Sequence, residues 1–177
     1  MGTLDRRPPV TERSFGIVLV RPTSPPGTQQ SGPNSSSSSF QVLLVHQHLR
    51  SGSSPSVSTF IALPKGHMDP DDETPLDAAI RELEEETSLR ISRSHILCDG
   101  ATIRERYTNP KNGKEKENTF WIAGLKEGEG EKLVVQEEEV LKAEWVDAAE
   151  ACDRVTFKET RLILEEALML LHRFTSQ

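Results

Sequence analysis

The sequence has few cysteines and no long apolar run, and both shortages narrow the classes of protein it can encode. Its two cysteines, Cys98 and Cys152, lie far apart without the close spacing of paired metal ligands. We therefore expect reduced structural thiols in an intracellular protein. No segment approaches the ~20 apolar residues of a membrane span, and the first twenty residues contain no apolar signal core. A cytoplasmic location is expected, with a nuclear one left open.

Basic residues are also in short supply. The chain of 177 residues carries 21 Lys and Arg against 28 Asp and Glu, a formal net charge of −7. A surface that binds nucleic acid by neutralising phosphates needs the opposite balance, so bulk nucleic-acid binding is disfavoured. An acidic protein that acts on phosphates needs a divalent cation as mediator, so clusters of carboxylates become the feature of interest.

Two stretches rich in serine interrupt the apolar pattern. Residues 22–39 carry neither charge nor a large apolar side chain, so nothing there offsets the entropy lost on ordering. We expect mobile insertions at 22–39 and 51–58, and interpret the first as a solvated linker in preference to a phosphorylated regulatory tail. With a flexible N-terminus at 1–12, this leaves a single domain over 13–177.

Short apolar and β-branched runs elsewhere predict strands. The first two runs are expected to pair as a hairpin with a lengthened connection, because loop closure entropy grows only slowly with loop length. A polar loop is expected at 109–118, between two of the later strands. The predicted strands lie at 15–20, 40–45, 59–63, 96–104, 119–125 and 143–146.

Two helices are predicted from their start signals. Thr74 followed by Pro75 is typical of a cap and first helical position, opening a helix that reaches about residue 88. Thr156 and Glu159 have capping-box spacing ahead of a C-terminal helix. Interspersed strands and helices favour an α/β protein in which helices cover both faces of a sheet.

Three glutamates converge on one side of the first predicted helix. At 100° per residue, Glu82, Glu85 and Glu86 share an arc rotated by roughly 120° from the apolar arc. Like charges three and four residues apart repel, and a hard divalent cation with oxygen ligands relieves that repulsion. Arg81 is one turn from Glu85 and is expected to pair with it, whereas Glu84 points away into solvent. Composition alone also allows a merely solvated acidic face.

The segment from Gly66 to Leu89 resembles the Nudix box, in which a glycine, a spacer and a glutamate precede an Arg-Glu-apolar-any-Glu-Glu-any-Gly-apolar pattern. The spacer after Gly66 is one residue longer than in the family, an insertion that a loop at 69–72 can absorb. Ser88 replaces the glycine that ends the helix in a left-handed conformation, at a cost of order 1 kcal/mol. The matching positions are Glu73, Arg81, Glu82, Leu83, Glu85, Glu86 and Leu89.

This resemblance implies an α/β/α sandwich around a mixed β-sheet, and hydrolysis of a nucleoside diphosphate linked to another group. The flanking sequences PKGH at 64–67 and TFKE at 156–159 look like the asymmetrical diadenosine tetraphosphate hydrolases. The implied ligands of Mg²⁺, or of Mn²⁺, are Glu82, Glu85 and Glu86. A metal-activated water would then attack the polyphosphate bridge and give ATP and AMP.

The proton acceptor remains open among three glutamates, and Arg81 joins them in the implied catalytic group. Glu85 and Glu86 are two candidates. Glu139 is the third, since it best matches an extra glutamate in a loop of the family, although an exposed acidic turn is an equal alternative at that position.

The resemblance also implies a small-molecule dinucleotide partner. Tyr107 and Phe157 match aromatic positions of the family's nucleoside site, and Lys65, His67 and Lys158 match basic ones. With aromatics at only 5% of the chain, one base should be held well and the other loosely. His46, expected at a strand end, would either contact phosphate or cap the strand.

Other functions stay open at this point. Diphosphoinositol polyphosphates or capped RNA would be alternative substrates of the same fold, and a module that binds nucleotide without turnover is the alternative outside enzymes. A monomer is expected.

Overall fold

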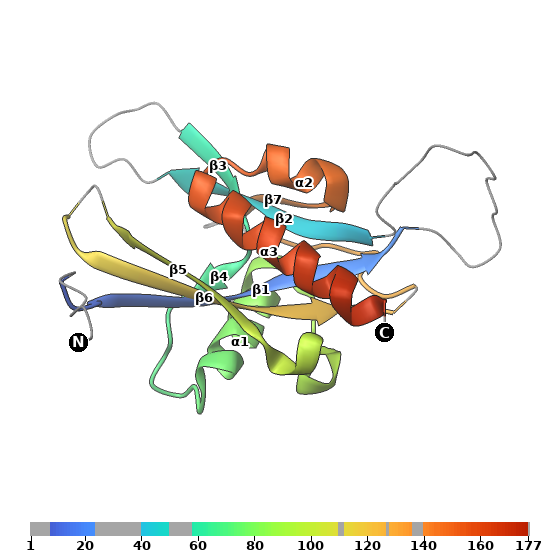
Figure 1. The fold of residues 1–177 in the computed structure, drawn as a ribbon, viewed down its shortest axis with the longest axis horizontal. Helices are drawn as coiled ribbons and strands as arrows, with labels where there is room; N and C mark the ends of the chain where they lie inside the picture. The colour runs from blue at the N-terminus through green and yellow to red at the C-terminus, as the bar shows by residue number, and fades with distance from the viewer. Residues whose placement is uncertain are drawn as a thin grey trace, which may run out of the picture.

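The computed structural model describes residues 8–23, 40–49, 58–109, 112–126, 128–135 and 140–176. Figure 1 shows the chain from blue at the N-terminus to red at the C-terminus. The strands are β1 (Glu12–Pro22), β2 (Phe40–Leu49), β3 (Ser58–Ala62), β4 (Lys65–Gly66), β5 (Thr102–Thr108), β6 (Glu115–Gly124) and β7 (Val140–Asp147). The α-helices are α1 (Pro75–Thr87), α2 (Ala148–Arg154) and α3 (Lys158–Thr175), and short 3₁₀ turns span Arg93–His95 and Cys98–Gly100.

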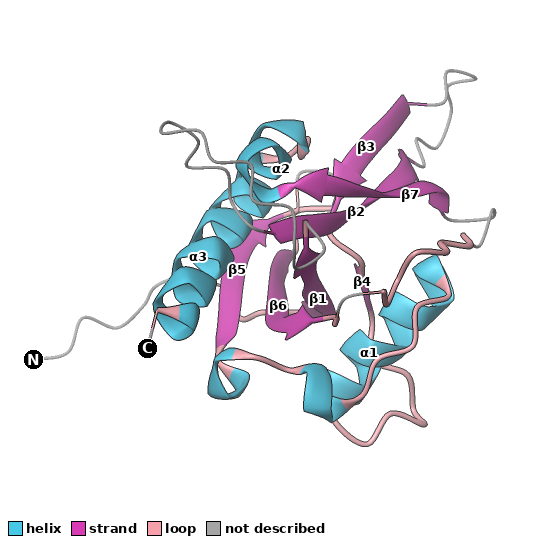
Figure 2. Cartoon of the chain, turned by 90° about the vertical axis from the view of Figure 1, so that its right-hand side faces the viewer, coloured by secondary structure: helices cyan, strands magenta, loops and turns pink. Residues whose placement is uncertain are grey.

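The seven strands form one mixed sheet. Its main order is β3-β2-β1-β6-β5, with β4 paired to β1 and β7 paired to β2. Strand β1 is parallel to β6 and antiparallel to β2. Figure 2 shows α1 on one face of the sheet and α2 and α3 on the other. This confirms the predicted α/β/α sandwich.

Strand β1 is apolar on both sides because both of its faces are covered. Phe15, Ile17 and Leu19 pack in the core beneath α1, whereas Val18 and Val20 pack in the core beneath α2 and α3. A strand buried on both faces shows a continuous apolar run instead of alternation. This arrangement explains the uninterrupted run at 15–20.

Both ends of α1 follow their predicted signals. The Thr74 hydroxyl accepts a hydrogen bond from the Asp77 backbone N–H at 3.3 Å. At the other end, Ser88 adopts a left-handed conformation with φ of 58°. Ala78, Ala79 and Leu83 are fully buried on the side that faces the sheet. Glu85 is thereby turned away from the core, whereas Glu86 is buried with the C-terminal end of the helix.

The predicted hairpin of β1 and β2 is confirmed, but the bounds of the insertions and of the N-terminus were drawn too wide. Pro22 still belongs to β1 and is paired with Phe40, and Ser58 already begins β3. Thr11 donates to the carbonyl of Glu115 at 3.0 Å. Pairing with neighbouring strands therefore orders residues whose own composition predicted mobility. The described residues do not include 1–7 or the central parts of the two insertions, 24–39 and 50–57.

Two further predictions in the middle of the chain are wrong. The strand expected at 96–104 begins only at Thr102, because Cys98 and Asp99 have positive φ angles that a strand does not allow. The polar loop expected at 109–118 ends earlier, since Glu115 is already paired with Thr108. The polar residues at the start of β6 belong to the sheet because they pair with residues of β1 and β5 through backbone hydrogen bonds.

The predicted capping box at the C-terminal helix is also wrong. Helix α3 starts at Lys158, and its N-cap residue Phe157 makes no side-chain cap. Thr156 instead bonds to the edge strand β3: its hydroxyl accepts from the Ile61 N–H at 2.8 Å, and its N–H donates to the Ile61 carbonyl at 2.9 Å. Thr156 therefore ties β3 to the segment between α2 and α3.

Both cysteines are free thiols, and Cys98 is buried. Within the described ranges, no helix combines the length and the apolarity needed to cross a membrane.

Candidate active site

Arg81 is the centre of a hydrogen-bond cluster on α1. Its Nη1 donates to Glu82 at 3.1 Å and to Glu85 at 2.8 Å, which confirms the expected pair with Glu85. Its Nε and Nη2 donate to the two carboxylate oxygens of Asp72 at 3.1 and 2.9 Å. The bond with Asp72 raises the pKa of Arg81 and lowers that of Asp72. Arg81 thus holds two glutamates and the preceding loop together.

The loop before α1 accommodates the longer spacer. The Asp69 N–H donates to Asp72 Oδ2 at 2.7 Å, and the Asp72 N–H donates back to the Asp69 carbonyl at 3.1 Å. The carbonyl of His67 accepts from Arg81 Nη2 at 2.7 Å. The additional residue therefore lies in a closed turn that leaves the helix register unchanged.

Gly66 makes room for the Glu82 carboxylate. A β-carbon placed on Gly66 would lie 1.9 Å from the carboxyl carbon of Glu82, so a larger residue at this position would displace the Glu82 carboxylate. Strand β4 therefore lies directly against the carboxylate face of α1. The first glycine of the motif leaves room for Glu82 in its present position.

Glu86 is the most enclosed of the three glutamates. It is 3% exposed, and it accepts a hydrogen bond from Gln47 Nε2 at 2.5 Å. Glu85, in contrast, leaves 48% of its side chain exposed. The carboxylate face therefore runs from a solvated edge at Glu85 to a buried end at Glu86.

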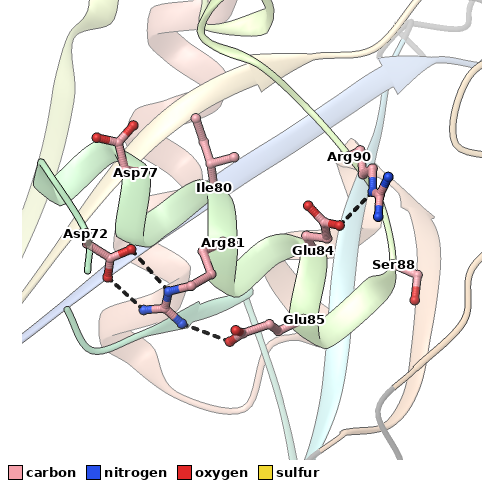
Figure 3. A pocket seen from close by; sticks show the side chains of 8 residues that line it. All are labelled: Asp72, Asp77, Ile80, Arg81, Glu84, Glu85, Ser88 and Arg90. Carbon is pink, nitrogen blue, oxygen red and sulfur yellow. Dashed lines mark hydrogen bonds and ion pairs between the residues drawn. The ribbon is translucent and has the colours of Figure 1, made fainter. Parts of the chain in front are cut away.

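A groove of about 740 Å³ runs along the outer flank of α1. Figure 3 shows its lining, with Arg81 between Asp72 and Glu85, and Arg90 bonded to Glu84. The Arg90–Glu84 distance is 2.6 Å, and 42% of the Glu84 side chain is exposed, in line with its expected place on the surface. Glu82 and Glu86 do not line this groove, which is therefore a flank of the carboxylate face and not its centre.

The donor set of the carboxylate face fits a hard divalent cation. Its side chains offer oxygen only, and the space before Glu82 is kept open by a glycine. Across the part of the chain that the structure describes, no three Asp, Glu, His or Cys side chains are already arranged around a metal position. The physical reason is that the carboxylates here engage Arg81 and Gln47.

The opposite face of the sheet carries basic and aromatic side chains. Lys65 precedes Gly66 in β4 and lies beside Phe120, a residue of the core under α3. A β-carbon placed on Gly16 would contact both side chains, which shows that they are adjacent. Burial, with Lys65 next in importance, lowers the pKa of Lys116. Burial likewise lowers the pKa of His67, with Lys116 and Lys65 adding to the effect. Two lysines therefore lie near one another and near the His67 ring, an arrangement that an anion stabilises.

Tyr107 belongs to the same neighbourhood, since it is paired with Lys116 in the sheet. Burial raises its pKa, and Glu159 of the first turn of α3 acts on it as well. Phe157, at the start of α3, is 42% exposed and contacts Phe60 with ring centroids 5.4 Å apart. Lys158 is exposed beside it. The start of α3 therefore faces the part of the sheet that holds Tyr107.

His46 differs from its predicted setting. It is not at a strand end, because β2 continues to Leu49. Its Nε2 lies 2.6 Å from Glu144, a carboxylate that also bonds Lys142 at 2.7 Å and Arg154 at 2.6 Å. These partners, Lys142 first, lower the pKa of Glu144. His46 is thus engaged in an ion-pair cluster and does not cap a strand.

The sequence did not predict two residues of the site, Gln47 and Lys116. A third residue, Glu139, was predicted but its position is not described. Gln47, which binds Glu86, gave no local signal because its partner lies on a different element. Lys116 was read as part of a polar loop, although its alternation with Asn118 and Phe120 along β6 was a usable signal. Glu139 lies outside the described residues.

Comparison with known proteins identifies the class. The model of the NUDIX domain family matches residues 34–167. Because this match covers more than half of the chain, the protein belongs to the Nudix family of pyrophosphohydrolases, whose members generally need divalent metal ions such as Mg²⁺. No curated protein matches the sequence.

Solved structures show the same fold at low sequence identity. A C. elegans Ap4A hydrolase in a binary complex has a TM-score of 0.66 and 22% identity, covering 93% of this chain and 100% of that one. The NUDIX domain of Shewanella oneidensis NrtR, complexed with ADP ribose, has a TM-score of 0.62 and 17% identity, covering 92% and 90%. RenU, a Nudix hydrolase from M. smegmatis, has a TM-score of 0.60 and 19% identity, covering 92% and 86%.

Proposed function

We propose that this chain hydrolyses diadenosine tetraphosphate asymmetrically into ATP and AMP. The observation that carries the proposal is the position of β4 between two sets of charged groups. Gly66 lies against the Glu82 carboxylate on the α1 side, and the adjacent Lys65 lies with the basic groups on the α3 side. A long polyphosphate bridge is the kind of substrate that can reach both sets.

The carboxylate side would hold the metal. Glu82, Glu85 and Glu86 would be the ligands of Mg²⁺ or Mn²⁺, which supplies a nucleophilic water and screens the negative charge of the bridge. Arg81 orients Glu82 and Glu85 through its bonds at 3.1 and 2.8 Å. Glu85 is more exposed than Glu86, so it can exchange a proton with solvent. Glu86 and Glu139 remain in the proposal as alternative bases.

The basic side would bind the nucleotide. Lys65 and Lys116 would contact phosphates as charged donors, and His67 would donate to phosphate through a ring N–H. Tyr107 and Phe157, from β5 and the start of α3, would contact the better-held adenine. Lys158 sits beside Phe157, where it would meet the phosphate next to that nucleoside. His46 is left out of the phosphate contacts because Glu144 already engages it.

Product analysis tests this proposal. Purified protein is incubated with diadenosine tetraphosphate in magnesium buffer, and the nucleotides are separated by chromatography. The proposal expects equal amounts of ATP and AMP, and their loss when the metal is chelated. Two ADP per substrate would show symmetrical cleavage and contradict it. Parallel reactions with ADP-ribose, a diphosphoinositol polyphosphate and capped RNA show whether another Nudix substrate is turned over instead.

A further inference from the structure

Three polar side chains form a row across adjacent strands on the face of the sheet beneath α3. Ser14 of β1 is paired with Asn118 of β6, and Asn118 is paired with Glu105 of β5. Directly paired residues point to the same face of a sheet. The next pair along this face is Tyr107 with Lys116. The row therefore lies beside Tyr107 and Lys116, two of the residues proposed above to bind the nucleotide.

Ser14 and Asn118 are buried, Glu105 is partly exposed, and the hydrogen bonding of all three side chains is incomplete. Ser14 and Asn118 are each 1% exposed. Among the residues that the structure describes, Ser14 Oγ, Asn118 Oδ1 and Glu105 Oε2 have no hydrogen-bond partner. Buried polar atoms are nearly always bonded, and each one left without a partner costs about 1–3 kcal/mol. Three such atoms in one row point to a ligand that completes them.

The chemistry of the row fixes what that ligand must offer. Asn118 Nδ2 donates to Glu105 Oε1, and a carboxylate only accepts. The amide therefore presents its Oδ1 as an acceptor, next to the second acceptor, Glu105 Oε2. Ser14 adds a hydroxyl, which can either donate or accept. With that hydroxyl as donor, the order across the strands is donor, acceptor, acceptor, and the two adjacent acceptors are the part that the Asn118–Glu105 bond fixes.

The Watson–Crick edge of guanine presents the complementary order: acceptor at O6, donor at N1 and donor at the N2 amino group. Adenine presents one donor, at N6, and an acceptor at N1. An adenine on the row would therefore leave one buried acceptor without a partner, and sites built on hydrogen bonds discriminate strongly against a base that leaves them incomplete.

We propose that Ser14, Asn118 and Glu105 form a base-recognition row that selects guanine over adenine for one nucleoside of the substrate. The inference rests on the proposed function and narrows it: diadenosine tetraphosphate remains a substrate, and a dinucleoside tetraphosphate with guanine at this end is the preferred one. Lys65 and Lys116 place the attached phosphates near the row, since both act electrostatically on Glu105.

Tyr107 lies next to the row. It follows Glu105 by two positions on the same strand face, so its ring would stack on a base that binds the row.

Nucleotide binding tests this inference without turnover. GTP and ATP are titrated into the full-length protein in chelator by calorimetry, and kcat/KM is then measured for the guanine and adenine dinucleoside tetraphosphates in magnesium. GTP should bind about tenfold more tightly than ATP or better, the discrimination typical of a bidentate base contact. Equal affinities, or tighter ATP binding, would overturn the inference.

Glu105→Gln provides the sharpest variant. Its amide oxygen must accept from Asn118, so its Nε2 faces the base as a donor that matches adenine N1. The variant should lose the guanine preference and favour ATP, and Ser14→Ala should reduce the preference severalfold. Glu117→Gln makes the same chemical change in the residue before Asn118, whose carboxylate pairs with Arg13. This control variant should keep the guanine preference. An unchanged preference in a folded Glu105→Gln protein would refute the row.

The two proposals can fail separately. Guanine-selective binding without hydrolysis of either dinucleotide would retain the row and remove the proposed function. Hydrolysis of both dinucleotides at equal efficiency, with equal binding of GTP and ATP, would retain the function and remove the row.

Discussion

Ser88 ends α1 in a conformation that suits glycine better than serine. Its φ of 58° lies in the left-handed region, where a β-carbon adds strain. Ser88→Gly should therefore stabilise the fold by up to about 1 kcal/mol, or ~2–4 °C in Tm for a chain of this size. Thermal denaturation followed by circular dichroism measures it. A lower Tm in the variant would mean that the serine hydroxyl compensates for the strain.

Glu105 should make stability depend on pH. Burial is the main cause that raises its pKa, against the Asn118 hydrogen bond and the charge of Lys65. The folded state then holds the proton to a higher pH than the unfolded state, so stability falls as pH rises above the ordinary glutamate pKa. Glu105→Gln should thus have the higher Tm at pH 7–8, with a difference that shrinks toward pH 4. A difference independent of pH would contradict the raised pKa.

Single residues differ in how far the sequence predicts their roles. The pair of Arg81 and Glu85 follows from helical spacing, as does the left-handed Ser88 from the motif position. The bond from Gln47 to Glu86 joins β2 to α1, and no local pattern contains it. Asn118 and Glu105 are opposite each other only because β5 and β6 pair in one particular register.

Helix α1 carries all three proposed metal ligands, Glu82, Glu85 and Glu86. Glu85→Gln preserves the shape of the side chain and removes one charge from the proposed metal face, so turnover should fall at least about a hundredfold. Tm should change little because Arg81 keeps its bonds to Asp72 and Glu82. Initial rates under saturating magnesium provide the test.

Glu84→Gln is the matched control for that substitution. Glu84 lies next to Glu85 on the same helix, but its partner is the exposed Arg90, and such surface pairs contribute ~0–1 kcal/mol. Turnover should stay within about twofold of the wild type. A large loss here, or wild-type rates in Glu85→Gln, would contradict the assignment of the metal face.

Elements are more predictable than their ends. The buried strands and α1 follow from apolar periodicity and cap residues within the local sequence. The misplaced strand near residue 100 reflects left-handed residues at Cys98 and Asp99, and the failed capping box reflects a bond from Thr156 to Ile61. The apolar run near residue 100 and the capping-box spacing at Thr156 are only statistical preferences. Backbone conformation in the first case, and a tertiary hydrogen bond in the second, determine the structure instead.

Over the whole molecule, the insertion between β1 and β2 can be removed by design. Pro22 and Phe40 are paired in register, so a two-residue turn can replace residues 23–39. Activity and Tm should stay close to wild type, with a slight gain from the shorter loop. Steady-state kinetics and thermal denaturation decide. Loss of activity in a folded variant would mean that the insertion reaches the substrate.

The arrangement of charge across the molecule also sets the length of substrate it should prefer. Carboxylates lie on the α1 side of β4, and lysines lie on the α3 side. Phosphates that reach both sides gain contacts with metal and lysines together. Each charge-assisted contact contributes about 1.5–3 kcal/mol, which for two further phosphates exceeds a hundredfold in rate.

The most direct test is therefore kcat/KM for diadenosine di-, tri- and tetraphosphate in one magnesium buffer, with ADP-ribose alongside. The account predicts a rise of at least about a hundredfold from the diphosphate to the tetraphosphate. It further predicts ATP and AMP as the products of the tetraphosphate. Equal efficiency across the series, or faster hydrolysis of ADP-ribose, would contradict it.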